Sequence, residues 1–295
     1  MSNKYRMKNL PPLLYFPRVF RKIAVGVTEM IKEVRISTME GLMELLSEQE
    51  YRPDLNRNRS SFVYRGMSDA AFRMETSLSR NCKHLTRTLE PVILKNFAKY
   101  AVIEDPTVAQ SVWRQMILGQ HHGLPTRLLD WTHSALVGLH FAVTEENLED
   151  MGAHDSLVWR IDIPELHSLL PENYQEIIKA EKAEVFSVDM LSRAASGLEK
   201  YDEDMGDSAM VVIEPPSINS RIVNQYAFFS IIPIGMTDVE GFLDKNTKNT
   251  VKYVIDRDFR WRVRDFLDQL NVSERIVYPG LDGLSKWIAR HYFVK

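Results

Sequence analysis

The sequence contains a single cysteine, Cys82, among its 295 residues. One cysteine excludes an internal disulfide framework and any metal site built from several thiolates. Low cysteine usage is typical of proteins that work in a reducing compartment, so we expect a cytoplasmic location.

The chain also lacks a strong excess of charge and a long apolar run. Its formal net charge is -3 and its isoelectric point is about 6.3, which gives no global support for binding to nucleic acid or to a membrane. A local basic groove stays open as an alternative, because Arg52, Arg57 and Arg59 lie close together. Prolines and basic residues interrupt the apolar stretch 10–27, so no membrane span is expected.

Familiar catalytic and phosphate-binding motifs are missing as well. The sequence has no Walker loop, no G-x-G-x-x-G, no H-E-x-x-H and no nucleophile elbow. His121 and His122 are adjacent, and on a helix adjacent side chains point about 100° apart. They are a poor pair of metal ligands, so no metal site is expected.

Helical and strand patterns are mixed along the chain. A capping-box pattern at 37–40 and apolar residues at four-residue spacing predict helices that begin near 39, cover 89–101 and run from 105 to 120. Apolar and β-branched segments predict strands at 61–66, 157–163, 209–213, 225–232 and 251–255. Amphipathic stretches at 258–270 and 283–292 predict two closing helices.

These elements predict an α+β fold with an N-terminal helical part followed by a mostly antiparallel sheet with flanking helices. No repeat and no clear linker divides the chain. We therefore expect one domain over residues 35–295, preceded by an N-terminal extension over residues 1–34.

Residues 120–132 read Gln-His-His-Gly-Leu-Pro-Thr-Arg-Leu-Leu-Asp-Trp-Thr and concentrate polar side chains in a short segment. The Gly-Leu-Pro sequence predicts the end of one helix, and Thr132 is expected to cap the next. One hypothesis for this segment is structural. In it, Arg127 and Asp130 pair with each other or with free backbone groups at the helix ends, while Leu128 and Trp131 anchor the turn in the core.

The other hypothesis is a ligand site. Arg65 ends a predicted strand and precedes Gly66, where a ligand could approach the backbone closely. A guanidinium binds phosphate through two parallel hydrogen bonds. The further candidates for a phosphate-bearing ligand such as a nucleotide are His121, Thr126, Arg221 and Gln225.

Several motifs together resemble the FRG domain, a family named for an aromatic-Arg-Gly motif. They are Phe62-Val-Tyr-Arg-Gly66, Ser77-Leu-Ser-Arg80, the segment 120–132, Asn219-Ser-Arg221 with Gln225, and 278–283. Together they span roughly residues 35 to 290. The chain departs from the pattern at Thr76, where proline is usual, at His122, which replaces an aromatic, and at Ala227, where glycine is expected.

The FRG resemblance implies a bacterial or phage protein, sometimes linked to phage defence. A weaker likeness to ADP-ribosyltransferases, which hold NAD phosphate with an early Arg-Gly, implies NAD as substrate and chemistry at the ribose C1 position. In that interpretation Arg65, Gly66, Thr126, Arg127 and Arg221 bind the nucleotide. The expected catalytic residues are His121, Gln225 and Asp130.

A glutamine is no strong base, so Gln225 would orient the attacking group while Asp130 or His121 handles the proton. Two alternatives remain. The first is a non-catalytic sensor or interaction module that meets a protein partner, and the second is a protein that acts on nucleic acid.

Overall fold

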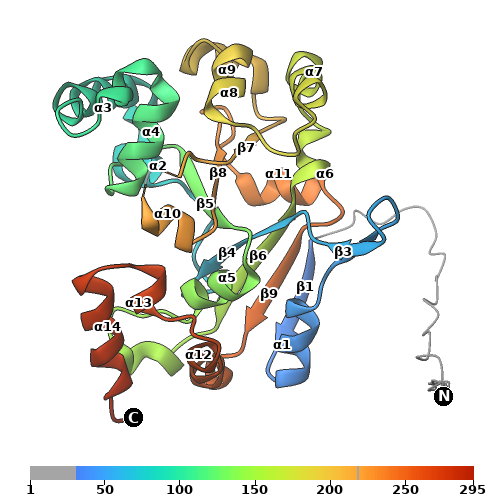
Figure 1. Cartoon of the computed structure of the whole chain (residues 1–295), viewed down its shortest axis with the longest axis vertical. Helices are drawn as coiled ribbons and strands as arrows, with labels where there is room; N and C mark the ends of the chain where they lie inside the picture. Colours follow the sequence, from blue (N-terminus) through green and yellow to red (C-terminus); the bar gives the residue numbers. More distant parts are fainter. Residues whose placement is uncertain (1–30, 218) are drawn as a thin grey trace, which may run out of the picture.

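The computed structural model describes residues 31–217 and 219–295 (Figure 1). Residues 1–30 of the predicted extension lie outside these ranges. The rest of that extension differs from the prediction, because Lys32 to Val34 already belong to the first strand. No helix in the two described ranges is long and apolar enough to cross a membrane.

Seven strands form one sheet in the order β1-β9-β6-β4-β5-β8-β7, and β2 pairs with β3 in a separate hairpin. All neighbours in the large sheet are antiparallel except β1 and β9, which confirms the predicted mostly antiparallel sheet. The strands are β1 (Lys32–Ile36), β2 (Glu50–Arg52), β3 (Arg57–Arg59), β4 (Phe62–Met67), β5 (Leu128–Thr132), β6 (Ser156–Asp162), β7 (Val211–Ile213), β8 (Ala227–Ile231) and β9 (Val251–Ile255).

Helices connect the strands and flank the sheet. The α-helices are α1 (Met39–Leu46), α2 (Ser77–Cys82), α3 (Thr86–Ala101), α4 (Val112–His121), α5 (Ala135–Ala142), α6 (Ile163–His167), α7 (Glu172–Glu181), α8 (Val188–Ala194), α9 (Leu198–Met205), α10 (Ser220–Asn224), α11 (Val239–Asn246), α12 (Arg260–Gln269), α13 (Glu274–Val277) and α14 (Leu281–His291). Short 3-10 helices are η1 (Lys83–Leu85), η2 (Pro106–Gln110), η3 (Leu148–Gly152) and η4 (Arg257–Phe259).

The two faces of the sheet are covered differently. Successive side chains of a strand point to opposite faces, so each strand contributes to two layers. One face packs against α6 and α11 as a single apolar cluster. The other face carries two separate clusters, one with α1, α5 and α12 over β9, β6 and β4, and one with α3, α4, α7, α8 and α9 over β5, β8 and β7.

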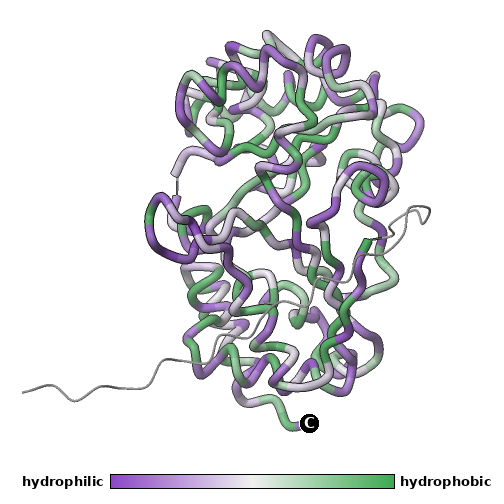
Figure 2. The backbone as a smooth tube through the Cα atoms, turned by 90° about the vertical axis from the view of Figure 1, so that its right-hand side faces the viewer, coloured by the Kyte–Doolittle hydropathy of each residue, from purple (hydrophilic) through white to green (hydrophobic). Residues whose placement is uncertain are grey.

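The two helical groups lie at opposite ends of the molecule in Figure 1. Hydrophobic stretches run through the centre, while hydrophilic residues concentrate at the outer turns (Figure 2). Because the two groups meet different strands of one face, the surface over the middle strands lies between them.

Strand β5 corrects the predicted helix-to-helix connection. Residues 128–132 form a strand in the middle of the sheet, where every residue except Asp130 is buried. A strand that is buried on both faces lacks the alternation that identifies strands from sequence. The next helix, α5, is capped by Ser134, whose hydroxyl accepts from the Val137 amide at 3.3 Å, and not by Thr132. Leu128 and Trp131 are buried, as predicted.

The helix predicted from Asp105 to Gln120 is also two elements. Asp105 does cap a helical segment, because its carboxylate accepts from the Thr107 amide at 2.8 Å. That segment is the 3-10 helix η2, and it ends at Ser111, whose backbone is extended at φ -156° and ψ 153°. The Ser111 hydroxyl then caps α4 by accepting from the Arg114 amide.

Candidate functional site

A pocket of about 300 Å³ lies over the middle strands, between the two helical groups. Strands β4, β5 and β8 contribute to it together with α4, α5 and α10. Tyr64 and Thr132 are the one registered pair between β4 and β5, so these strands separate beyond it. We call this cavity the β4–β5 pocket.

Six of the eight predicted site residues line the β4–β5 pocket, although they come from elements far apart in the sequence. They are Arg65, Gly66, His121, Asp130, Arg221 and Gln225. The other two predicted residues, Thr126 and Arg127, are buried outside it. Residues that the sequence did not identify complete the lining, and they are Tyr64, Gln120, Trp131, Thr132, Phe141, Ile222, Ala227 and Phe229.

Arg65 lies where β4 and β5 separate. Its Nη1 donates to the backbone oxygen of Asp130 at 2.8 Å and lies 3.6 Å from the Asp130 carboxylate. The side chain is only 19% exposed, and its Nε has no hydrogen-bond partner among the described residues. Burial lowers the pKa of Arg65 and Asp130 opposes this effect, but an arginine remains charged. The hydrogen bond from Nη1 leaves Nη2 as a donor for a ligand, whereas the buried Nε does not face the solvent.

Arg221 enters the pocket from α10. Its guanidinium stacks over the ring of Tyr278 at 5.0 Å, and its Nε is buried without a partner within residues 31–217 and 219–295. Among the side chains that line the pocket, two arginines face one carboxylate, that of Asp130. The pocket therefore carries an excess of positive charge, unlike the chain as a whole.

His121 lies at the end of α4 with a defined tautomer. Asn219 uses its side-chain oxygen to accept from the Ile222 amide at 3.0 Å, so its Nδ2 is the atom that lies 2.8 Å from His121 Nε2. An amide nitrogen only donates, so His121 Nε2 accepts and the ring proton resides on Nδ1. Burial, Arg221 and His122 lower the pKa of His121, which keeps the ring neutral at pH 7.

Asp130 and Gln120 form a polar pair on the same side of the pocket. Gln120 Nε2 donates to Asp130 Oδ2 at 2.9 Å, and Gln120 Oε1 accepts from the Thr126 hydroxyl at 2.5 Å. Thr126 thus orients Gln120 from behind instead of lining the pocket. The Asp130 side chain is 56% exposed, so its carboxylate is accessible to a ligand.

Gln225 differs from its predicted place within a strand. It is the C-cap of α10, and β8 begins two residues later at Ala227. Its Nε2 donates to the Val277 oxygen at 3.2 Å, which leaves Oε1 as an acceptor. The residue with positive φ in this turn is Tyr226, at 47°, so Ala227 occupies an ordinary strand position despite the glycine expected there.

Gly66 is explained by packing within the chain. A Cβ atom at this position would lie 2.0 Å from the Gly138 oxygen and 2.5 Å from the Ala142 nitrogen, both on α5. Only a residue without a side chain allows α5 to approach β4 this closely. The backbone that comes close to Gly66 is therefore that of α5, whereas the sequence suggested a ligand.

Arg127 corrects the predicted pair with Asp130. Its Nε and Nη2 bind the Glu90 carboxylate, and its Nη1 donates to Asp202 at 2.6 Å. Burial opposes the charge, but Glu90 and Asp202 raise the pKa of Arg127 well above its ordinary value. Arg127 and Glu90 are both buried, so this ion pair joins α3 and α9 to the start of β5.

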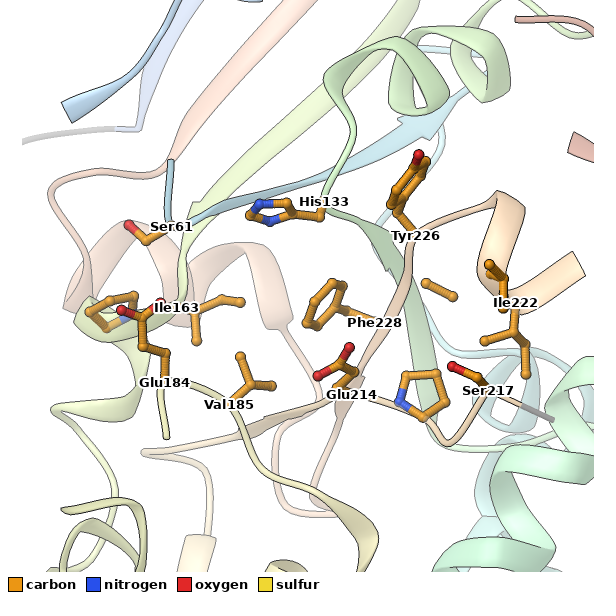
Figure 3. A pocket seen from close by; sticks show the side chains of 14 residues that line it. Ser61, His133, Ile163, Glu184, Val185, Glu214, Ser217, Ile222, Tyr226 and Phe228 are labelled. Carbon is orange, nitrogen blue, oxygen red and sulfur yellow. The ribbon is translucent and has the colours of Figure 1, made fainter. Parts of the chain in front are cut away.

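A second hollow, of about 380 Å³, lies beside α10 and shares Ile222 and Ala227 with the β4–β5 pocket. Figure 3 shows His133, Phe228 and Tyr226 around it, with Glu184 and Glu214 as its carboxylates. No lysine or arginine lines it. Its charge is therefore unsuited to a phosphate. No group of His, Cys, Asp or Glu in the described part of the chain is arranged to hold a metal ion.

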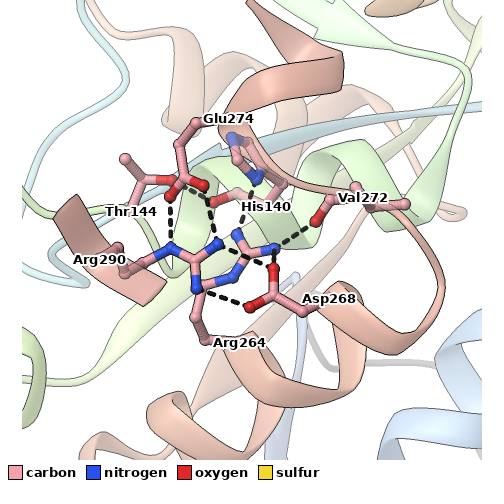
Figure 4. A network of polar contacts seen from close by, with 7 residues as sticks. All are labelled: His140, Thr144, Arg264, Asp268, Val272, Glu274 and Arg290. Atoms are coloured by element: carbon pink, nitrogen blue, oxygen red, sulfur yellow. Dashed lines mark hydrogen bonds and ion pairs between the residues drawn. The ribbon is translucent and has the colours of Figure 1, made fainter. Parts of the chain in front are cut away.

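A third polar cluster ties the C-terminal helices to α5 (Figure 4). Arg264 Nη1 lies 2.7 Å from His140 Nδ1, and Arg290 binds both Glu274 and Asp268 at 2.6–2.8 Å. We call these five residues the C-terminal network. Two arginines and two carboxylates balance in charge, and burial lowers the pKa of His140 to about 3, which keeps it neutral.

Residues 60–151 match the family model of the FRG domain. The match confirms the resemblance over β4, α4 and β5, which carry Arg65, His121 and Asp130. Arg221 and Gln225 complete the pocket from outside the matched segment. Comparison of the chain with curated proteins and with solved structures finds no match.

Proposed function

We propose that this FRG-domain protein binds a nucleotide of the NAD type in the β4–β5 pocket and cleaves or transfers at the ribose C1 position. The observation that carries the proposal is the excess of guanidinium over carboxylate in a pocket with aromatic walls. Arg65 and Arg221 line it beside Phe141 and Phe229, and Asp130 is the one carboxylate among the described residues of its lining.

The two arginines are suited to phosphate. Their Nε atoms are buried, so a ligand in the pocket would meet these guanidinium groups at their Nη atoms. A phosphate oxygen accepts from guanidinium donors with short, charge-assisted hydrogen bonds. A phosphate between Arg65 and Arg221 would supply these acceptors and neutralise the local charge.

The remaining polar groups suit a ribose and its reaction. His121 retains an Nδ1 proton as a donor, and Gln225 retains Oε1 as an acceptor for a hydroxyl or a water. In hydrolysis, the water oxygen bonds to C1 while the base leaves with the electron pair of the broken C1–N bond. Asp130 is the accessible carboxylate that would take the proton of the water.

The competing functions predict other surfaces. A nucleic-acid reader would use the exposed β2–β3 hairpin, where Arg57 and Arg59 lie, but Arg52 is already paired with Asp54 and Glu184. A non-catalytic module would need no ligand in the pocket. The cytoplasmic location and the role in phage defence belong to this proposal too, the latter only through the FRG resemblance.

Calorimetric titration of the purified protein with NAD, ATP and a short oligonucleotide tests the proposal, with mass spectrometry to detect NAD breakdown. We expect the wild type to bind NAD, and we expect Arg221→Ala to lower the affinity for NAD. Arg275→Ala is the matched control, because Arg275 stacks on Trp287 at 4.7 Å as Arg221 stacks on Tyr278, but does not line the pocket. A wild-type protein that binds none of these ligands contradicts the proposal, and a protein that binds only the oligonucleotide favours the nucleic-acid alternative.

A further inference from the structure

A groove of about 930 Å³ adjoins the β4–β5 pocket at the ends of α3 and α4. His121 lines both cavities, so they adjoin at its imidazole ring. Asn219 also lines the groove, and it holds His121 through Nε2. We call this surface the α3–α4 groove.

The α3–α4 groove differs from the pocket in chemistry. Its apolar lining includes Phe97, Tyr100 and Leu118, and no lysine or arginine lines it. The charged side chains in its lining are the carboxylates of Glu104 and Asp105, which repel a phosphate. Aromatic rings bind nucleobases by stacking, and carboxylates accept from exocyclic amino groups. The groove therefore suits a base, and the pocket suits a phosphate.

The size of the pocket supports a ligand that extends beyond it. Its volume of about 300 Å³ is at the low end for small-molecule sites, which span roughly 300–1,000 Å³. A dinucleotide has two nucleosides joined by phosphates, so it needs a phosphate site between two base sites. The α3–α4 groove offers one such base site, which meets the pocket of the two arginines at His121.

We propose that the α3–α4 groove binds the second nucleoside of a dinucleotide whose phosphates lie between Arg65 and Arg221. This inference rests on the proposed function, and it names the groove as the surface that distinguishes a dinucleotide from a mononucleotide. The reacting ribose occupies the β4–β5 pocket near Asp130 and Gln225. The base of the other nucleoside contacts the rings of both Phe97 and Tyr100, with His121 at the junction.

The test compares NAD with nicotinamide mononucleotide, which has one nucleoside and one phosphate. Both are titrated by calorimetry into the wild type, Phe97→Ala and Tyr100→Ala. Tyr292→Ala is the matched control, because its side chain is 76% exposed against 67% for Tyr100 and it lies outside the groove. We expect each groove variant to lower the affinity for NAD by about tenfold, because one stacking contact is lost, and to leave the affinity for the mononucleotide unchanged.

The outcomes separate the inference from the function on which it rests. If NAD binds equally well to the wild type and both groove variants while Arg221→Ala weakens it, the groove assignment is wrong and the nucleotide proposal stands. Equal affinities of the wild type for NAD and the mononucleotide would also show that the groove assignment is wrong. If the folded wild type binds neither ligand, the groove assignment and the nucleotide proposal are both wrong. Circular dichroism of each variant confirms that the fold is intact before the affinities are compared.

Discussion

The β4–β5 pocket and the C-terminal network are built from the same kinds of side chain, with opposite results. Each contains two arginines, at least one carboxylate and a histidine. In the network, Arg264 and Arg290 are both buried, and every charge has a partner of opposite sign (Figure 4). In the pocket, Arg65 lies 3.6 Å from the exposed carboxylate of Asp130, and no ion pair of Arg221 is found among the described residues.

The difference separates a structural role from a binding role. A buried charge is tolerated when ion pairs offset its loss of water. In the network the ion pairs with Asp268 and Glu274 do this, although Arg264 Nε and His140 Nε2 have no hydrogen-bond partner among the described residues. A cluster with surplus charge and an open face is stabilised further by a ligand of opposite charge. The same contrast applies to Arg127, which pairs with Glu90 and Asp202 away from the pocket.

The largest expected effect comes from breaking the network. Arg290→Ala leaves the buried carboxylate of Glu274 without its partner, at a cost of roughly 3–5 kcal/mol in the free energy of unfolding. Urea denaturation measures the loss, and Arg262→Ala, at an exposed position on the same helix as Arg264, is the control. An unchanged midpoint for Arg290→Ala would show that the network contributes little to stability.

The second prediction concerns the wall that the pocket shares with the core. Gly66→Ala places a Cβ against the backbone of α5, so we expect a loss of roughly 1–3 kcal/mol or more from overpacking. Gly152→Ala is the control, because a Cβ there meets nothing within 4 Å. If Gly66→Ala folds with normal stability but loses ligand binding, Gly66 serves the ligand and our packing interpretation is wrong.

The third prediction is a loss of ligand affinity without the loss of stability that the first prediction expects. Arg221→Ala should leave the free energy of unfolding nearly unchanged. It should weaken NAD binding by roughly 1.5–3 kcal/mol, about ten- to a hundred-fold in affinity, because a charge-assisted hydrogen bond is lost. Arg65→Lys should lose affinity as well, because an ammonium lacks the planar fork of a guanidinium. Calorimetry and urea denaturation on the same samples separate the two quantities. A destabilised Arg221→Ala with normal affinity would make Arg221 a structural residue.

The fourth prediction uses pH on the buried histidine of the network. The pKa of His140 is about 3 in the folded protein and about 6.5 when unfolded, so the unfolded chain binds an extra proton between these values. Stability therefore falls as the pH drops below 6.5, by roughly 1.4 kcal/mol per pH unit for this group. Urea denaturation at pH 6.5 and 5.5 should show a smaller loss for His140→Gln than for the wild type. Equal losses would show that His140 does not titrate in this way.

Much of the site could be predicted because polar residues are dense in one short segment. Arg65, His121 and Asp130 stood out beside glycines and apolar residues, and the structure brings them together with Arg221 and Gln225. The direction of each side chain could not be predicted. Whether Arg127 joins Asp130 or Glu90 depends on β5 being a strand, which its continuous burial concealed.

The fold likewise has elements that could be predicted from the local sequence and elements that could not. The strands of the second half of the chain have apolar, β-branched sequences, and they were predicted close to their observed bounds. Residues 32–34 of strand β1 fell within the predicted extension. The strand sequence, Lys32-Glu-Val-Arg-Ile36, is mostly polar, as suits an edge strand with one neighbour. Its partner β9 lies more than two hundred residues later, and local patterns carry no information about such a pairing.

The central claim is that the arginines of the β4–β5 pocket bind phosphate, and a crystal structure with ADP-ribose tests it most directly. ADP-ribose carries the phosphates and both riboses of NAD but lacks the bond that the enzyme would cleave. We expect phosphate oxygens within hydrogen-bond distance of Arg65 and Arg221, with a ribose facing Asp130 and Gln225. An empty pocket in crystals grown with the ligand, or phosphates bound away from both arginines, would contradict it.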